Sequence, residues 1–399
     1  MNRRNNMKRI AIPLLLSLSL LLSGCQNTDT GSNGGDSAST GAESVAVIDT
    51  AALFSDWDLD GSYDESAAVH IQLEGETAVC DSDAVSIDGS RITLLDEGTY
   101  LVSGALTDGQ IVVDAGDTDK VQIVLAGASL TCADSAAIYS KSADKVFLTL
   151  AEGTENTLTN GGSYIAIDEN NIDSVVFSKT DLTLNGSGSL TIDAQAGHGV
   201  VSKDELTING GTFTVDSVDD CLHSGGALAV TGGTFTLSSG DDAIHSDDAV
   251  TIRAGEFSIP YCYEGVEGLS VTVEGAAFDV TAHDDGFNAA GGADSSGFGG
   301  RDEPFAASED SFITVNGGTI TVVSDGDCLD SNGDLTVNGG TLDLTCNGNG
   351  NTALDCSGSY TNNGGSVTTN DGSETNSGGR SGNRLEEERE PLPSGRPKA

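Results

Sequence analysis

A repeat of about 22 residues runs through the middle of this 399-residue chain. The motif Leu-Thr-Ile-Asn-Gly-Gly-Thr-Phe at residues 206–213 returns, with substitutions, at 228–235, 250–257 and 271–278. The starting positions advance by 22, 22 and 21 residues, and each copy is followed by an acidic segment such as Asp-Asp-Cys-Leu-His at 219–223. A fixed period in this range is typical of a solenoid, in which each repeat buries its apolar face against its neighbours.

The repeat units have the character of β-strands. Short β-branched runs such as residues 110–113, 121–125 and 146–150 are separated by Gly, Asp and Asn, and the whole chain has only six prolines. Strands of this length at a constant period predict an all-β fold, a single-stranded parallel β-helix with about 22 residues per coil. We expect it to span residues 45–369, with an insertion loop at 290–310.

The two ends of the chain read differently from the repeats. Residues 1–25 resemble a lipoprotein signal peptide, with basic residues in the first nine positions and an apolar run at 14–22 that is too short to span a membrane. Its last four residues, Leu-Ser-Gly-Cys, form a lipobox that would place a lipid on Cys25; the alternative is a plain secretory signal. Residues 26–44 predict a flexible tether and 370–399 a disordered tail. We therefore expect an extracytoplasmic protein, anchored to the bacterial cell membrane by this lipid alone.

The charge of the chain restricts its partners. The formal net charge is -45, and after Lys203 only Arg253 and Arg301 are basic before the tail. No basic surface is available for nucleic acid or anionic lipid, so neither is an expected partner. The seven cysteines other than Cys25 include no C-x-x-C pair and are expected to be small buried residues of a monomer.

Stacked coils turn equivalent residues into columns of like charge. Carboxylates about 5 Å apart repel by several kcal/mol at an effective dielectric near 20, so such a row needs raised pKa values or bound cations. Calcium takes six to eight oxygen ligands, which this ladder supplies. We hypothesise one or more Ca²⁺ ions among the acidic residues of four successive coils: Asp219, Asp220, Asp241, Asp242, Glu264, Asp284 and Asp285. The alternative is a solvated acidic ridge that caps turns by local hydrogen bonds.

Two further patterns concern metals. His223 and His245 lie one coil apart near carboxylates, which is compatible with a transition-metal site or with histidines that point outward from an acidic face. The Asp-x-Asp-x-Asp-Gly segment at 56–61 resembles the start of an EF-hand loop but has Ala67 where the loop requires Glu. Its alternative interpretation is an acidic turn that caps the end of the solenoid.

Several longer motifs resemble a known family. The runs Ala-Glu-Gly-Thr-Glu-Asn at 151–156 and Phe-Ser-Lys-Thr-Asp-Leu-Thr-Leu at 177–184 are similar to those of bacterial carbohydrate-binding β-helix lipoproteins of the clostridial cellulose- and acidic-sugar-binding type. The resemblance covers about residues 45–368. It implies a right-handed, pectate-lyase-like parallel β-helix that binds calcium and plant-type polysaccharide, and it supplies no catalytic residue.

Non-catalytic binding of an acidic or cellulose-like polysaccharide is the function that we expect. The candidate carbohydrate contacts are the aromatic and polar residues nearest the acid ladder: Tyr261, Tyr263, Phe287, Asn288, His223 and His245. The first alternative is a calcium-dependent polysaccharide lyase, which needs a basic residue as proton acceptor; Arg301 and Arg253 are the candidates. A polygalacturonase-type hydrolase would rest on Gly-His-Gly at 197–199 alone, and a surface adhesin or scaffold is the remaining class.

Overall fold

The computed structural model describes residues 54–165, 168–289 and 310–375. All of them fall in one compact unit, Asp49–Ala399. The signal segment with Cys25, the tether, residues 290–309 of the insertion with Arg301, and residues 376–399 lie outside the described residues. In the described part, no helix is long and apolar enough to cross a membrane.

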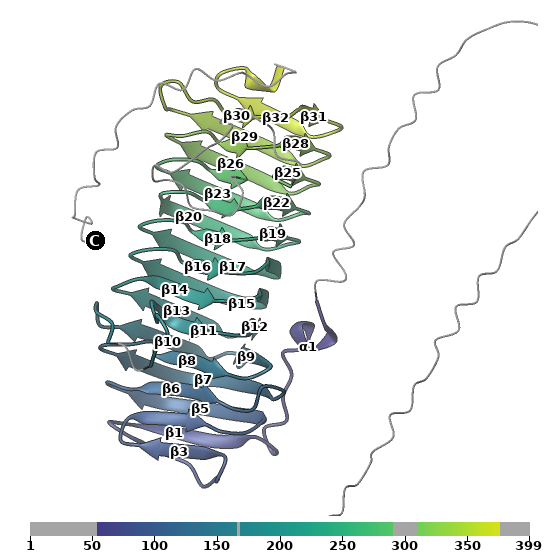
Figure 1. The fold of residues 1–399 in the computed structure, drawn as a ribbon. Helices are drawn as coiled ribbons and strands as arrows, with labels where there is room; N and C mark the ends of the chain where they lie inside the picture. Colours follow the sequence, from purple (N-terminus) through teal and green to yellow (C-terminus); the bar gives the residue numbers. More distant parts are fainter. Residues whose placement is uncertain (1–53, 166–167, 290–309, 376–399) are drawn as a thin grey trace, which may run out of the picture. The chain divides into compact units, whose positions relative to one another are not determined.

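The described chain is a parallel β-solenoid of about ten turns with roughly 24 residues per turn, so the predicted β-helix is confirmed (Figure 1). Its strands form a 20-stranded and a 12-stranded sheet. The larger sheet contains β1 (Val69–Gly75), β2 (Ala78–Val79), β5 (Gly98–Leu106), β7 (Lys120–Cys132), β9 (Lys145–Leu150), β10 (Glu155–Asn160), β12 (Asp181–Gly186), β13 (Ser189–Ala194), β15 (Leu206–Ser217), β17 (Leu228–Ser239), β19 (Ala249–Ile252), β20 (Glu256–Cys262), β22 (Ser270–Val273), β23 (Ala277–Ala282), β25 (Phe312–Val315), β26 (Thr319–Ser324), β28 (Asp334–Val337), β29 (Thr341–Cys346), β31 (Tyr360–Asn362) and β32 (Ser366–Thr369).

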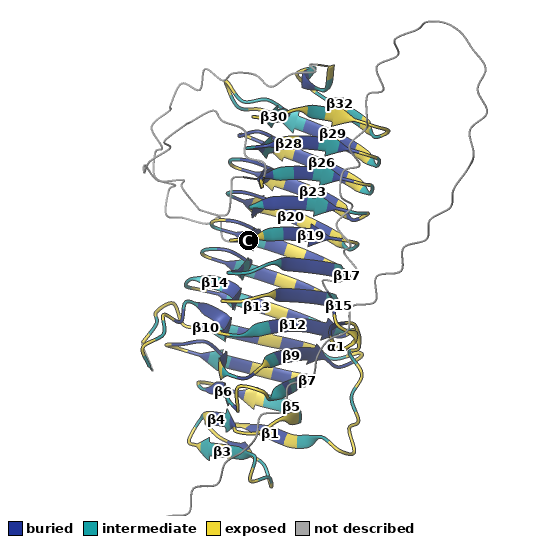
Figure 2. Ribbon diagram, turned by 45° about the vertical axis from the view of Figure 1, so that its right-hand side comes forward, coloured by how far each residue is buried: buried dark blue, intermediate teal, exposed yellow. Residues whose placement is uncertain are grey.

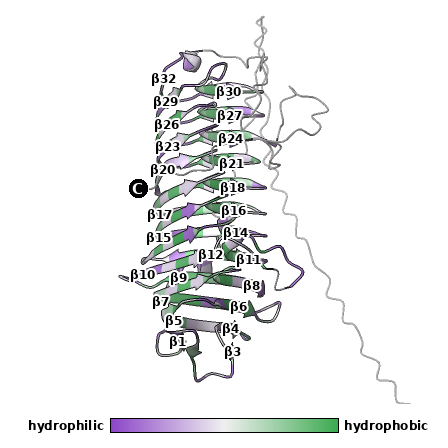
Figure 3. Ribbon diagram, turned by 90° about the vertical axis from the view of Figure 1, so that its left-hand side faces the viewer, coloured by the Kyte–Doolittle hydropathy of each residue, from purple (hydrophilic) through white to green (hydrophobic). Residues whose placement is uncertain are grey.

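The smaller sheet carries the acidic positions of the repeat. It contains β3 (Val85–Asp88), β4 (Arg91–Leu94), β6 (Gln110–Asp114), β8 (Ile138–Ser142), β11 (Ser174–Ser178), β14 (His198–Ser202), β16 (Leu222–Ser224), β18 (Ile244–Ser246), β21 (Val266–Gly268), β24 (Phe287–Ala289), β27 (Leu329–Ser331) and β30 (Leu354–Cys356). These strands lie above one another as successive rungs (Figure 3). Each coil therefore adds one short rung to this sheet.

The register follows the repeat of the sequence. Leu206 pairs with Leu228 in the larger sheet, and Leu222 pairs with Ile244 in the smaller one. Side chains alternate between the core and the outside along each strand, which gives the buried and exposed stripes of Figure 2. The last position of the repeat forms an aromatic stack inside the core, with ring centroids 5.3, 4.5 and 4.4 Å apart along the series Phe213, Phe235, Phe257 and Phe278.

Both ends of the solenoid depart from the parallel pattern. β1 pairs with β2 and β3 pairs with β4 in antiparallel fashion, which leaves less open parallel edge at the first coil. At the other end, Asp371 accepts a hydrogen bond from the backbone N–H of Ala353, and the 3-10 turn η2 (Ser373–Thr375) begins at a serine that binds the N–H of Leu354. The contacts of the solenoid thus continue to residue 375, past the expected boundary at 369.

The interpretation of residues 56–61 as a turn that caps the end of the solenoid was wrong. The helix α1 (Asp56–Leu59) lies beside the middle coils, where the side chain of Asn209 donates 2.9 Å to the carbonyl of Leu59 (Figure 1). The carboxylate of Asp58 is buried and bonds Lys145 at 2.7 Å and Thr183 at 2.6 Å. These contacts use the middle aspartate of the Asp-x-Asp-x-Asp-Gly segment to hold the N-terminal segment against the coils.

The cysteines behave as small core residues. The seven cysteines of the described region are unpaired, and six of them are buried while Cys80 is half-buried. Burial raises the pKa of the Cys221 thiol to about 12, which keeps it neutral and unreactive at physiological pH.

Candidate functional site

Two neighbouring columns of polar side chains run up the smaller sheet. The strand column, named for its place in the short strands, is set by direct register pairs between successive coils and consists of His223, His245, Glu267, Asn288, Asp330 and Asp355. The turn column lies three residues earlier in most coils and consists of His198, Asp220, Asp242, Glu264, Asp285 and Asp327. Together we call them the acid–histidine ladder, and their stacking confirms the predicted columns.

The side chains of the turn column cap the backbone of the next coil. Oδ1 of Asp220 accepts 3.0 Å from the N–H of Asp242, and Oδ1 of Asp285 accepts 2.6 Å from the N–H of Asp327. Asp327 binds the N–H of Thr352 in the same way. This local capping is the structural role that the alternative interpretation of the ridge assigned to the acidic residues.

Three turn-column carboxylates direct an oxygen toward the strand column. Oδ2 of Asp220 lies 2.8 Å from Nδ1 of His223, and Oδ2 of Asp242 lies 2.9 Å from Nδ1 of His245. One coil later, Oε2 of Glu264 accepts 3.0 Å from the amide of Asn288. Asp220 shows both contacts at once, with one oxygen on the backbone of the next coil and the other on the neighbouring column.

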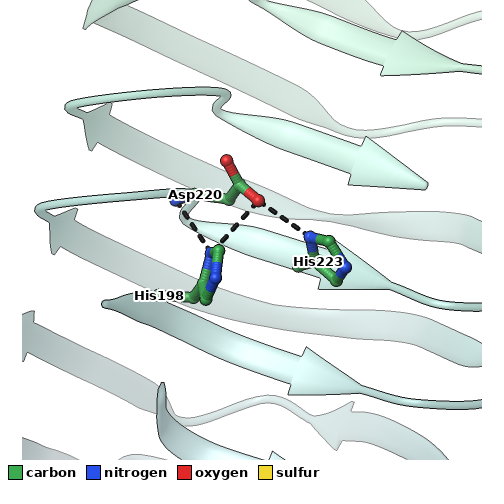
Figure 4. A group of neighbouring side chains, drawn as sticks. All are labelled: His198, Asp220 and His223. Atoms are coloured by element: carbon green, nitrogen blue, oxygen red, sulfur yellow. Dashed lines mark hydrogen bonds and ion pairs between the residues drawn. The ribbon is translucent and has the colours of Figure 1, made fainter. Parts of the chain in front are cut away.

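His198 begins the turn column with an imidazole in place of a carboxylate. Its Nδ1 lies 3.1 Å from both the backbone N–H and Oδ2 of Asp220, and the same Oδ2 contacts His223 (Figure 4). Burial opposes ionisation of Asp220, but the hydrogen bonds with His198 and His223 hold the pKa of that carboxyl below its usual value. At the start of the ladder, the negatively charged carboxylate of Asp220 therefore lies between the imidazoles of His198 and His223.

His245 is buried between carboxylates, so the expectation of outward-pointing histidines is wrong at this position. Its Nδ1 lies 2.9 Å from Asp242 and 3.1 Å from Glu267, and its ring stacks on that of His223 with centroids 4.7 Å apart. Burial alone would lower the pKa of His245, but the two carboxylates raise it to about 11. The imidazole is therefore cationic at neutral pH and partly neutralises its neighbours.

The later rungs of the ladder contain oxygen ligands alone. From Glu264 onward, both columns carry only carboxylates and one amide. Burial raises the pKa of Glu264 and of Asp285 well above its usual range, and the neighbouring carboxylates Glu267 and Asp330 add to the two shifts. Carboxylate oxygens of Asp327, Asp330 and Asp355 all lie within 4.8 Å of one another. This oxygen-only half of the ladder has the donor set of a calcium site.

Small residues hold the rungs close together. A Cβ on Gly265 would lie 2.3 Å from the carbonyl oxygen of Gly286, and a Cβ on Gly286 would lie 2.6 Å from that of Cys328. Space at these positions is therefore too narrow for a side chain. This narrow spacing also explains why the acidic columns on either side stay in register.

The remaining predicted metal ligands lie in an adjacent, more accessible position. Asp219 and Asp284 are half-buried and Asp241 is exposed, each one residue before a turn-column carboxylate. Oδ2 of Asp284 accepts 2.7 Å from the hydroxyl of Tyr263. The seven predicted acidic residues thus lie along one side of the solenoid, but four belong to the ladder and three flank it.

The predicted carbohydrate contacts are divided in the same way. Phe287 is 1% exposed and packs edge-on against Phe278, so its assignment as a sugar contact was wrong. Asn288 and His245 are also buried, whereas His223 is half-buried. Tyr261 is 41% exposed and packs against the ring of His283, which makes this tyrosine the accessible aromatic residue next to the ladder.

Of the two predicted basic residues, the described structure places Arg253 away from the ladder. Arg253 follows β19 on the turn toward β20, and its guanidinium lies 5.7 Å from the ring centroid of Phe54 in the N-terminal segment. That contact places it with the segment containing α1 rather than with the short strands. Arg301 lies outside the described residues.

Sequence reasoning omitted three members of the oxygen-only half from the metal ligands. Asp327, Asp330 and Asp355 follow the same spacing as the earlier rungs, since Asp330 pairs with Asp355 in parallel register. The insertion between β24 and β25 separates them from the regular repeats in the sequence. These three residues could have been found by continuing the repeat period on the far side of that insertion.

Comparison with known proteins gave three matches. A family model described as carbohydrate-binding domain-containing protein matches residues 88–350 and 241–383. A protein of that description from Acetivibrio thermocellus is 37% identical over 135 residues, which are 33% of this chain and 47% of the relative, so the match spans about half of that relative's length. A solved structure of a polysaccharide lyase-like protein from C. thermocellum, a gadolinium derivative, has a TM-score of 0.45 at 24% identity over 76% of this chain and 94% of that one.

Proposed function

Because the chain belongs to the family of carbohydrate-binding domain-containing proteins, we propose that it binds polysaccharide at the cell surface without cleaving it. The observation that carries this proposal is that the family match covers the coils that build the acid–histidine ladder. The polysaccharide that we propose carries carboxylates, and Ca²⁺ connects it to the protein.

The oxygen-only half of the ladder is the proposed calcium site. Carboxylate oxygens of Asp327, Asp330 and Asp355 lie within 4.8 Å of one another. Two like charges at such a distance repel by roughly 3 kcal/mol at an effective dielectric of 20. A divalent cation removes that repulsion and takes the oxygens that face the strand column. The earlier rungs need no such ion, because His198, His223 and His245 already pair with their carboxylates.

The exposure of these residues fits a bridging role. Asp330 and Asp355 are half-buried, whereas Asp285 and Asp327 are buried. A calcium ion held from one side by protein oxygens keeps coordination positions for water or for a uronate carboxylate. Tyr261 and Tyr263, at the edge of the same coils, are then placed to contact sugar hydroxyls.

Binding is proposed rather than lyase chemistry because of where Arg253 lies. Proton abstraction from a uronate needs a base beside the metal. Arg253 instead packs against Phe54, and no observation on the described residues places a base at the oxygen-only half. The expected product of mixing protein and polygalacturonate is a complex, with no release of unsaturated sugars.

Surface display is part of the proposal and rests on the signal sequence. The lipobox ending at Cys25 would attach the mature chain to the membrane, with residues 26–44 as a tether. In a bacterial host, the wild-type chain should incorporate a labelled fatty acid and sediment with membranes. The variant Cys25→Ala should lose both properties, and unchanged labelling would contradict the anchor.

The calcium proposal is tested by titration of the full-length chain in detergent. We expect 1 mM Ca²⁺ to raise the melting temperature by about 5 °C, since a ligand that binds only the folded state stabilises it. Polygalacturonate should be retained in a pull-down with Ca²⁺ and lost with chelator. The double variant Asp330→Asn, Asp355→Asn should lose both responses.

A matched control separates metal binding from a general loss of charge. Asp343 lies exposed on β29 near the same coils, so Asp343→Asn removes a charge without touching the ladder. It should behave as the wild type. If calorimetry detects no heat of Ca²⁺ binding to the wild type and its melting temperature is unchanged by Ca²⁺, the calcium site is refuted. If the wild type binds no polysaccharide in a broad panel, the proposed function is refuted.

A further inference from the structure

We propose that a second sugar-binding site, which shares no residue with the ladder, lies in the hollow between the N-terminal segment and strands β5, β7 and β9, and that it takes a neutral sugar unit. This inference rests on the proposed carbohydrate binding and names a place and a ligand class for it. The hollow has a volume of about 540 Å³. It is lined by Asp56, Trp57, Asp60, Ser62, Tyr63, Asp64, Thr99, Gln122 and Phe147.

The hollow is built by specific contacts. Asp58 is buried and fixes α1 to β9 and β12 through Lys145 and Thr183, and Asn209 holds the helix at its last residue. Beyond the helix, the amide of Gln122 donates 3.3 Å to the carbonyl of Ser62. The segment is thus held against the solenoid on both sides of the hollow.

Aromatic surface faces the hollow. Trp57 is 60% exposed, although its ring centroid lies 6.0 Å from that of Phe147, and Tyr63, which also lines the hollow, is half-buried. Exposure of so much tryptophan surface has no benefit for folding, whereas an aromatic face provides a platform for the apolar face of a pyranose ring. Pockets of 300–1,000 Å³ with apolar walls and a few polar groups are typical of small-ligand sites.

The polar groups of the hollow match the hydroxyls of a sugar. The hydroxyl of Thr99 donates 3.0 Å to Gln122, whose amide nitrogen donates to Ser62 and Thr149, so these two side chains form an ordered polar wall. Asp56, Asp60 and Asp64 supply carboxylate acceptors along the N-terminal segment. Sugar hydroxyls donate well to carboxylates, so these side chains can orient a ring that stacks on Trp57.

The charge of the hollow decides between neutral and acidic sugars. Three carboxylates line it, and Lys145, which lies over the ring of Phe147, is paired with Asp58 at 2.7 Å. A uronate would bring another negative charge into this surface and would be repelled. The geometry therefore points to a neutral hexose or pentose unit, bound without calcium, in contrast to the acidic polysaccharide proposed for the ladder.

Trp57 is the only tryptophan of the chain, so its fluorescence reports on this hollow alone. The full-length chain is titrated with cellohexaose, xylohexaose and mannohexaose, and with hexagalacturonate as the acidic comparison, all in the presence of chelator. At least one neutral oligosaccharide should change the emission in a saturable manner. Hexagalacturonate should bind at least tenfold more weakly than that oligosaccharide.

Two variants and a control test the assignment by calorimetry. Trp57→Ala should weaken binding of the neutral oligosaccharide at least tenfold, and Val79→Ala, which truncates another exposed apolar residue, should leave it unchanged. Asp56→Lys should narrow the preference for neutral over acidic sugar at least threefold, an effect that a purely structural role would not produce. Unchanged melting temperatures confirm that the variants are folded.

The possible failures are distinguishable. If polysaccharide is retained in pull-downs but no neutral oligosaccharide changes Trp57 emission, or if Trp57→Ala binds as well as the wild type, the second site is wrong and the proposed function stands. A preference of the hollow for hexagalacturonate would also overturn the inference. If no glycan of any class is bound, the proposed function and this inference fail together.

Discussion

The backbone N–H of Asp242 donates a 3.0 Å hydrogen bond to Oδ1 of Asp220, one coil earlier, while Oδ2 of Asp220 faces His223. One carboxylate thus has two separate duties: it satisfies a backbone donor of the next coil and it presents charge to the strand column. A buried backbone donor without a partner costs free energy comparable to a lost hydrogen bond. The acidic character of the ladder is therefore partly architectural, and its effect on stability can be separated from its effect on metal binding.

Replacing Asp220 tests the architectural duty. Asp220→Ala leaves the N–H of Asp242 and the imidazoles of His198 and His223 without their acceptor, and should lower the free energy of unfolding by about 2–4 kcal/mol. Asp220→Asn keeps an oxygen for the N–H and should cost less. Urea unfolding measures both, and equal losses in the two variants would contradict the capping role.

An exposed aspartate provides the control for this pair. Asp279 lies outward on β23, where its neighbours Phe278 and Val280 face the core. Asp279→Ala should change the free energy of unfolding by less than about 0.5 kcal/mol. A loss as large as that of Asp220→Ala would mean that net charge, and not the ladder contact, sets the stability.

The ion pair of Asp58 predicts a dependence of stability on pH. Burial opposes ionisation of Asp58, but bonds from Lys145, Ser55 and Thr183 outweigh it and hold the pKa of the carboxyl below its usual value. A group with a lowered folded-state pKa stabilises the protein above its unfolded value, about 3.9, and this contribution is lost as the pH falls through the folded-state pKa. Unfolding followed by Trp57 emission should therefore show wild type and Asp58→Asn converging below pH 4.

The size of that difference follows from burial of the pair. The side chains of Asp58 and Lys145 are 3% and 12% exposed, so Asp58→Asn should cost about 3 kcal/mol at pH 7 by leaving the ammonium unpaired. The double variant Asp58→Asn, Lys145→Met should recover part of this loss. A difference between wild type and Asp58→Asn that is the same at pH 7 and pH 3 would rule out the ionised pair as its source.

The repeated part of this fold was predictable from sequence because the same motif of about 22 residues recurs in coil after coil. Residues 22 apart pair directly, as Leu222 with Ile244, so reading the period was sufficient to place His223 beside His245. Within a rung, the apolar position between the two columns faces the core, and Phe287 belongs to that position. Its assignment to the sugar contacts failed because nearness to charged residues in sequence was given more weight than the alternation of side chains.

The N-terminal segment was not predictable by the same route. It lies outside the repeat, and its position depends on single contacts between distant parts of the chain, such as Asp58 with Lys145 and Asn209 with Leu59. The acidic spacing at residues 56–60 suggested a calcium loop, whereas the contacts use one of its carboxylates to fix the segment to the coils. The hollow beside Trp57 forms only because this segment packs against the coils, so no local sequence pattern predicts it.

The close spacing of the rungs leads to a last prediction at Gly286, between the ladder residue Asp285 and the core residue Phe287. A Cβ at this position would lie 2.4 Å from Cγ1 of Val322 and 2.6 Å from the backbone oxygen of Cys328, so Gly286→Ala should lower the free energy of unfolding by about 1–3 kcal/mol. At Gly232 nothing lies within 4 Å of such a Cβ, and Gly232→Ala should be neutral or stabilise by up to about 1 kcal/mol. If the coils are as tightly stacked as these distances require, the changes in unfolding free energy caused by the two substitutions will differ in sign, or the unfolding equilibrium constants of the two variants will differ at least tenfold. Equal urea midpoints would show that the coils can move apart at the ladder.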